Sequence, residues 1–96
     1  MFSIPAINVI SSDEGFGVEI LGHTRIRYFD GVAETHFSME YATGISGLVI
    51  FARQNEIVGP PESSRIGQAL NDAEREKAVK NIRDAFQFTG WEIDVF

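Results

Sequence analysis

The ionisable side chains that could do chemistry lie at alternate positions between residues 25 and 40. They are Arg25, Arg27, Glu34, His36 and Glu40. Alternation of this kind places side chains on one face of a β-strand or hairpin. An imidazole among carboxylates could bind a metal or transfer protons. A solvated sheet face with cross-strand ion pairs explains the same pattern without any further assumption, and the sequence favours that second interpretation.

No other stretch carries a recognisable catalytic or cofactor motif. The chain has no cysteine, which excludes a disulfide, a thiol nucleophile and a Cys-ligated zinc site. Its two histidines lack the tight spacing of a metal-binding motif. The glycine-containing pieces fit turns rather than a phosphate loop or a dinucleotide fingerprint. We therefore predict no catalytic residue, no cofactor and no metal.

The polar side chains are positioned by a predicted antiparallel meander over Phe16–Tyr41. The dipeptide Asp30-Gly31 is a strong signal for a two-residue hairpin turn. A turn there pairs Arg27 with Glu34 and separates an apolar face from a charged one. A slip of one residue would mix the two faces.

A second turn, predicted as a three-residue loop over residues 21–23, gives a compatible register, although Gly22 could instead mark a bulge in one long bent strand. The loop pairs Glu19 with Arg25, and the apolar faces of the two hairpins coincide. A short first strand is predicted over Ile7–Ser11, ahead of the meander.

The stretch after the meander is predicted to change from strand to loop. Gly47–Ala52 is a continuous apolar run, which is typical of a strand that is buried on both faces or central in its sheet. Thr43–Gly47 is predicted to be the turn leading into it. Arg53–Leu70 is predicted to be irregular, because Pro60-Pro61 cannot join a regular element. Loops of this length are often functional, although a simple crossover from sheet to helix fits equally well.

One amphipathic helix is predicted over Asn71–Gly90. Asn71 and Glu74 form a capping-box pattern at its start, and the glycine at its end favours a left-handed terminus. Ala78 and Ala85 lie on the apolar stripe, so we expect the helix to pack closely on the sheet. A last strand is predicted over Trp91–Phe96, where apolar and polar residues alternate.

These elements predict a single α+β domain over residues 1–96. It consists of a mostly antiparallel meander sheet of about five or six strands, with the C-terminal helix on one face and a short final strand after it. The net charge of −6 argues against nucleic-acid binding. The chain shows no signal peptide and no apolar run of membrane-spanning length, so we expect a soluble cytoplasmic protein that does not bind membranes.

Three pieces of the chain, in order, resemble one family of small bacterial proteins. The pieces are IRYFDG (26–31), GLVIFA (47–52) and the C-terminal run GPPE…LNDAEREKAVKNIRDAFQFTGWEIDVF, and they are similar to immunity proteins of polymorphic toxin systems. In that family a strand is followed by a proline-containing loop and an acidic helix start. The helix carries an Asn-Ile pair near its middle, here Asn81-Ile82, and a glycine and a short strand end the pattern.

The resemblance implies a non-enzymatic protein that binds and neutralises a cognate protein toxin. An acidic immunity protein is complementary to a basic toxin. Three candidate contact residues lie on the polar sheet face, namely Glu34, His36 and Glu40. Four more lie in the predicted loop, namely Asn55, Glu56, Glu62 and Arg65.

Two other functions fit the sequence. The Arg25/Arg27/His36 face could belong to a small ligand-binding or metal-binding domain, or to an enzyme. The chain could also be a structural module that forms homodimers by pairing edge strands.

Overall fold

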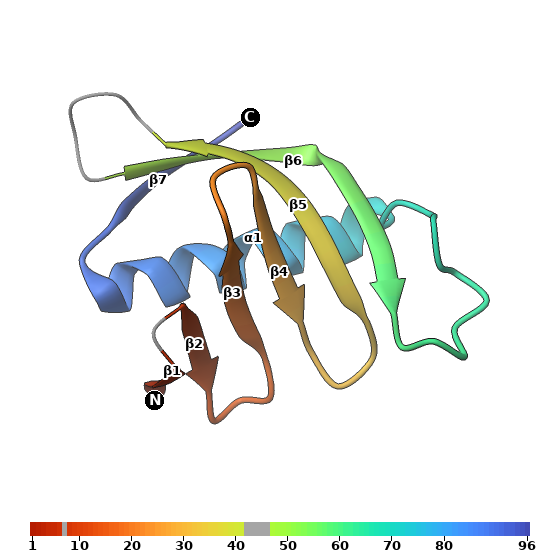
Figure 1. Ribbon diagram of the computed structural model, residues 1–96, viewed down its shortest axis with the longest axis horizontal. Helices are drawn as coiled ribbons and strands as arrows, with labels where there is room; N and C mark the ends of the chain where they lie inside the picture. The colour runs from red at the N-terminus through yellow and green to blue at the C-terminus, as the bar shows by residue number, and fades with distance from the viewer. Residues whose placement is uncertain (7, 42–46) are drawn as a thin grey trace.

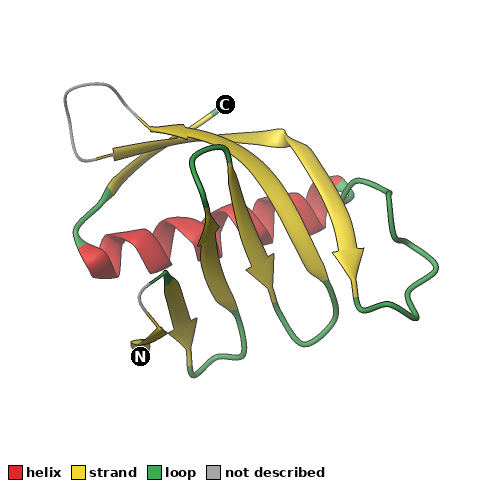
Figure 2. Cartoon of the chain, in the orientation of Figure 1, coloured by secondary structure: helices red, strands yellow, loops and turns green. Residues whose placement is uncertain are grey.

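A computed structural model describes residues 1–6, 8–41 and 47–96, and these residues form one mixed sheet with one helix. Figure 1 shows the course of the chain and Figure 2 its secondary structure. The elements are β1 (Phe2–Ala6), β2 (Val9–Ser12), β3 (Gly17–Leu21), β4 (Arg25–Phe29), β5 (Glu34–Tyr41), β6 (Gly47–Gly59), α1 (Asp72–Thr89) and β7 (Glu92–Val95).

The sheet has seven strands in sequential order, rather than the five or six that we predicted. The additional strand is β1. Pro5 lowers the strand signal of this segment, but proline is tolerated on an edge strand such as β1. Neighbouring strands are antiparallel from β1 to β6, whereas β7 pairs with β6 in parallel. The parallel pair arises because α1 carries the chain back to the start of β6, as a helical crossover does.

The helix α1 crosses one face of the sheet and closes the core there (Figure 1). Ala78 and Ala85 are buried on its inner stripe, as predicted, together with Ile82 and Phe86. Cα atoms of α1 lie within 8 Å of Cα atoms in β2, β3, β6 and β7. The small alanine side chains are consistent with this close approach.

A buried polar contact ties the middle of α1 to the sheet. The side-chain Nδ2 of Asn81 donates a hydrogen bond of 2.9 Å to the hydroxyl of Tyr28. Burial is the main cause that raises the pKa of Tyr28 above its ordinary value, so the hydroxyl stays protonated at neutral pH. Asn81 is therefore a structural residue of this fold.

Both predicted hairpin registers are wrong by two residues. Arg27 stands opposite His36 rather than Glu34, and Leu21 rather than Glu19 stands opposite Arg25. The β4–β5 turn is longer than predicted, because the Asp30 carboxylate accepts hydrogen bonds from two following backbone amides, at positions 32 and 33. A shift of two residues leaves every side chain on its predicted face, because the side-chain period of a strand is two.

The predicted loop over Arg53–Leu70 is wrong in its first part. β6 continues through this region to Gly59, so Asn55 and Glu56 lie on a strand and not in a loop. A bulge separates the two halves of β6, since Phe37 pairs with Asn55 while the next residue, Ser38, pairs with Phe51. The strand bends midway (Figure 2). The irregular stretch begins only at Pro60, where the backbone can no longer donate to a ladder.

The termini of the other predicted elements differ slightly. The predicted first strand corresponds to β2, which starts at Val9, and its residue Ile7 lies outside the described residues. The predicted turn over Thr43–Gly47 lies outside them as well, except for its last residue. The predicted capping box at Asn71 and Glu74 is confirmed. No helix in the described ranges has the length and apolar character needed to cross a membrane.

Candidate functional site

The sheet face opposite α1 carries the ionisable side chains singled out from the sequence. Glu19, Arg27, His36 and Glu56 stand in one row across β3, β4, β5 and β6. The Nε of Arg27 donates a hydrogen bond of 2.8 Å to Oε1 of Glu19, and its Nη1 lies 3.4 Å from Oε2 of Glu34. The predicted Arg27–Glu34 ion pair is present. Because of the shifted register, Glu19 pairs with Arg27 instead of Arg25.

The guanidinium of Arg27 also contacts an aromatic ring. Its guanidinium carbon lies 4.3 Å from the ring centroid of Phe29, which is a cation–π contact. The Phe29 ring lies across Gly17, where a Cβ atom would come within 2.3 Å of the ring. The absence of a side chain at Gly17 thus leaves space for the Phe29 ring, which contacts Arg27.

The bulge in β6 opens a polar cleft of about 290 Å³ beside this row of charges. The polar residues that line the cleft come from β4, β5 and β6. They are Arg25, His36, Ser38, Gln54, Asn55 and Glu56. The structure therefore brings three of the predicted contact residues, His36, Asn55 and Glu56, to one cleft.

His36 is a neutral group in this setting. Burial is the largest cause that lowers its pKa, and the positive charges of Arg25 and Arg27 lower it further. Its Nδ1 lies 3.5 Å from Nη1 of Arg25. At neutral pH the cleft presents the Arg25 guanidinium, a neutral imidazole and the Glu56 carboxylate. This set can recognise a polar or mixed-charge surface through hydrogen bonds.

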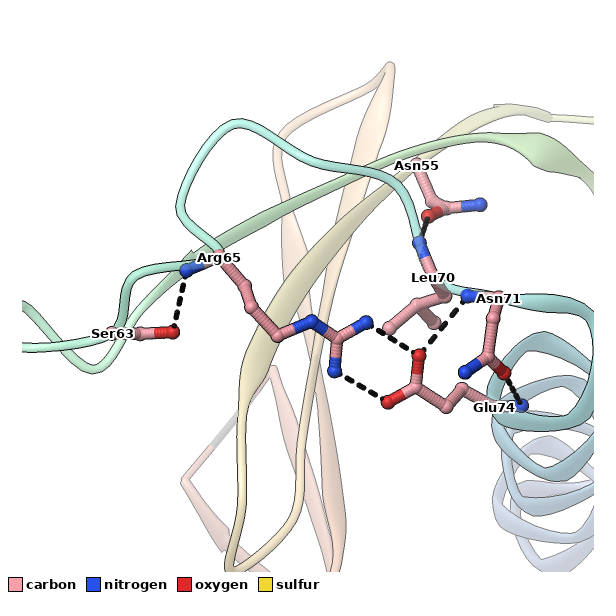
Figure 3. A network of polar contacts seen from close by, with 6 residues as sticks. All are labelled: Asn55, Ser63, Arg65, Leu70, Asn71 and Glu74. Atoms are coloured by element: carbon pink, nitrogen blue, oxygen red, sulfur yellow. Dashed lines mark hydrogen bonds and ion pairs between the residues drawn. The ribbon is translucent and has the colours of Figure 1, made fainter.

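The loop after β6 is fastened to the start of α1 by a polar network (Figure 3). Two guanidinium nitrogens of Arg65 each lie 2.6 Å from a carboxylate oxygen of Glu74, forming a bidentate pair. The Asn55 side chain accepts a hydrogen bond of 2.8 Å from the amide of Leu70 and donates one of 2.7 Å to the carbonyl of Ala52. Asn55 and Arg65 thus have structural contacts in addition to their predicted role.

The remaining predicted contact residues lie apart from the cleft. Glu62 is exposed in the loop after Pro61, and Glu40 is exposed near the far end of β5. Glu34 lies next to Arg27, one row away from the cleft. The sequence reasoning missed Ser38 and Gln54. Ser38 alternates in phase with His36, which was a usable signal, but nothing in the sequence marks the bulge that exposes Gln54.

Within the described residues, no group of three or more His, Asp or Glu side chains is arranged to hold a metal ion. Comparisons with protein-family models, curated proteins and solved structures found nothing that matches this chain.

The network at the start of α1 leads to a prediction about pH. The hydrogen bonds from Arg65 are the main cause that lowers the pKa of Glu74 to about 2, from 4.5 for a free carboxyl, and the Asn71 amide adds to the effect. A lowered carboxyl pKa stabilises the fold above pH 4.5, and this contribution is lost as the pH falls towards 2. We expect Glu74→Ala to lower the free energy of unfolding at pH 7 by roughly 1 kcal/mol, since solvent screens this partly exposed pair.

Urea denaturation at several pH values measures this effect. The difference between the parent chain and Glu74→Ala should shrink as the pH is lowered through this range. Glu74→Gln is the control, because glutamine keeps an oxygen for the Asn71 amide but has no charge. A difference that persists unchanged at pH 2 would contradict the assignment.

Proposed function

We propose that this chain is a non-enzymatic immunity protein that binds a cognate toxin and neutralises it. The support from the sequence is the resemblance carried by IRYFDG, GLVIFA and the C-terminal run. The net charge of −6 supports a basic partner, because complementary charge speeds association and discriminates against other proteins.

The observation that carries the proposal is the uncovered sheet face. It joins a row of paired charges to a polar cleft, and Arg27 is fixed there by Glu19, Glu34 and Phe29. A rigid, preorganised face loses little side-chain entropy when a partner docks. We propose that the toxin contacts this face, with Glu34, His36 and Glu56 at the centre of the contact.

The direct experiment is co-expression with the product of the adjacent gene. An affinity-tagged chain should retain that product on a column, and its expression should restore growth to cells that make the toxin. If no complex forms and growth is not restored, the proposal is wrong.

Reversal of charge on the proposed face gives a sharper result. Glu56→Lys should weaken binding of a basic toxin roughly tenfold, mainly through slower association at low salt. Surface plasmon resonance at two salt concentrations measures the rates. Glu14→Lys is the matched control, because Glu14 is exposed in the turn between β2 and β3, away from the Glu56 row. Equal loss in both variants would mean that only net charge matters.

The cleft favours one alternative, a small-anion binder. Arg25 and His36 both line the cleft, with Nη1 of Arg25 3.5 Å from Nδ1 of His36. Arg25 has no ion-pair partner among the described residues. Isothermal titration with inorganic phosphate, compared between the parent chain and Arg25→Ala, tests this function. Saturable heat that disappears in the variant would support it.

A further inference from the structure

A groove on the other side of the molecule follows the free edge of β7. Its larger part has a volume of about 410 Å³ and lies between Val95, Ala52 and the flank of α1 around Val79. A smaller part of about 270 Å³ continues along residues 91–94 and shares Arg83 and Gln87 with the first. The two parts together line the whole length of β7.

The strand β7 is an edge of the sheet, since within the described residues it pairs only with β6. The amide of Phe96 donates to the carbonyl of Ile50, and its carbonyl accepts from the amide of Ala52, so both groups of Phe96 point towards β6. Successive residues of a strand direct these groups to opposite sides. The N–H and C=O groups of Ile93 and Val95 therefore point outward from the sheet edge, as donors and acceptors for another strand.

The two faces of β7 differ in chemistry. Ile93 and Val95 are in register with buried Leu48 and Ile50 and face α1, on the apolar side of the groove. Glu92 and Asp94 are exposed on the opposite face. Neither carboxylate has an ion-pair partner in the described part of the chain.

The acidic side of this edge extends onto β5. Glu40 stands in the same row as Val49 and Asp94, on the face away from α1. Glu92 and Asp94 thus form an acidic border along the edge, and Glu40 adds a third carboxylate to the same face, beyond β6. On the α1 side, Lys80 is paired with Asp84, and Arg75 with Asp72. Glu76 and Arg83, which also line the groove, carry opposite charges and have no ion-pair partner among the described residues.

We propose that this edge binds an extended segment of a partner protein, which adds a strand beyond β7. The segment has alternating apolar and basic residues. Its apolar side chains enter the groove between β7 and α1, and its basic side chains lie over Glu92 and Asp94. This segment pairs with the free edge of β7, whereas the contact proposed for the toxin centres on Glu34, His36 and Glu56 of β5 and β6.

A second copy of this chain is a poorer occupant of the same edge. Antiparallel pairing of β7 with itself would bring Glu92 and Asp94 of the two copies together on one face. Like charges on adjacent strands destabilise pairing and protect an edge from self-association. The charge pattern therefore selects a basic foreign strand over another β7.

The test uses the intact chain and the synthetic peptide acetyl-Lys-Val-Lys-Val-Lys-amide. Trp91 is the single tryptophan of the chain and lines the smaller part of the groove, so its fluorescence reports binding directly. We expect a saturable change in emission. The same peptide with alternate amides methylated should bind roughly tenfold more weakly, because its strand hydrogen bonds are lost. The peptide with Glu in place of Lys should also bind more weakly.

Two variants locate the site. Val79→Lys replaces an apolar side chain of the larger part of the groove with a charged one and should abolish the fluorescence change, while circular dichroism confirms that the variant is folded. Val32→Lys is the matched control, because Val32 is 77% exposed in the distant β4–β5 turn, and it should bind like the parent chain. No saturable change, or equal affinity for the methylated peptide, would overturn the proposal. Sedimentation that shows a dimer lost in Val95→Lys would assign the edge to a second copy and overturn it as well.

Discussion

Replacement of Phe86 by alanine is expected to lower the free energy of unfolding by about 4 kcal/mol. Phe86 is 1% exposed on the inner stripe of α1 and belongs to the main core cluster. Removal of a buried ring loses its transfer free energy and leaves a cavity that the close-packed sheet cannot fill. Since a small domain is stable by about 5–15 kcal/mol, the loss would consume much of the total.

The matched control is Phe88→Ala, the same change one half-turn away on the same helix. Phe88 is 49% exposed, and its ring centroid lies 5.5 Å from that of Phe2. The aromatic contact and partial burial predict a loss of only about 1 kcal/mol. Urea denaturation monitored by circular dichroism measures both variants. Equal losses would show that α1 does not present the stripe described here.

Ala85→Leu is expected to lower the free energy of unfolding by about 3 kcal/mol, the upper end for overpacking. Ala85 is fully buried, at 0% exposure, where α1 lies against the sheet. A larger side chain there must push the helix away from the sheet or adopt a strained rotamer. The corresponding fall in the melting temperature is roughly 10 °C or more for a domain of this size.

Ala73→Leu separates packing from helix propensity. Ala73 is exposed in the first turn of α1, and leucine forms helices almost as well as alanine. This variant should change the free energy of unfolding by less than about 0.5 kcal/mol. Differential scanning calorimetry compares the two variants. An unchanged melting temperature for Ala85→Leu would mean that the helix does not approach the sheet closely.

The candidate site was predictable only in part, because its residues depend on long-range placement. The alternating positions of Glu34 and His36 identified the open face correctly. The cleft itself depends on the β6 bulge, where the chain departs from a period of two and no local signal marks the change. Asn55 and Glu56 were recognised as candidates but were placed on a loop, because Pro60-Pro61 obscured the strand that precedes them.

Local chemistry in the sequence determined the elements and their faces. The capping box of Asn71 and Glu74 involves residues three apart, and the apolar stripe of α1 follows from the helical period, so both could be predicted. The side-chain faces of β4 and β5 also follow from alternation, although alternation cannot detect a shift of two residues.

Only the tertiary structure decided which distant groups meet. The parallel pairing of β7 with β6, the Arg65–Glu74 pair and the Asn81–Tyr28 hydrogen bond each join segments whose separation leaves many partners possible. Selection among those partners comes from burial of one shared core and from satisfaction of the polar groups around it. The same collective packing bends β6, opens the polar cleft and leaves the edge of β7 exposed.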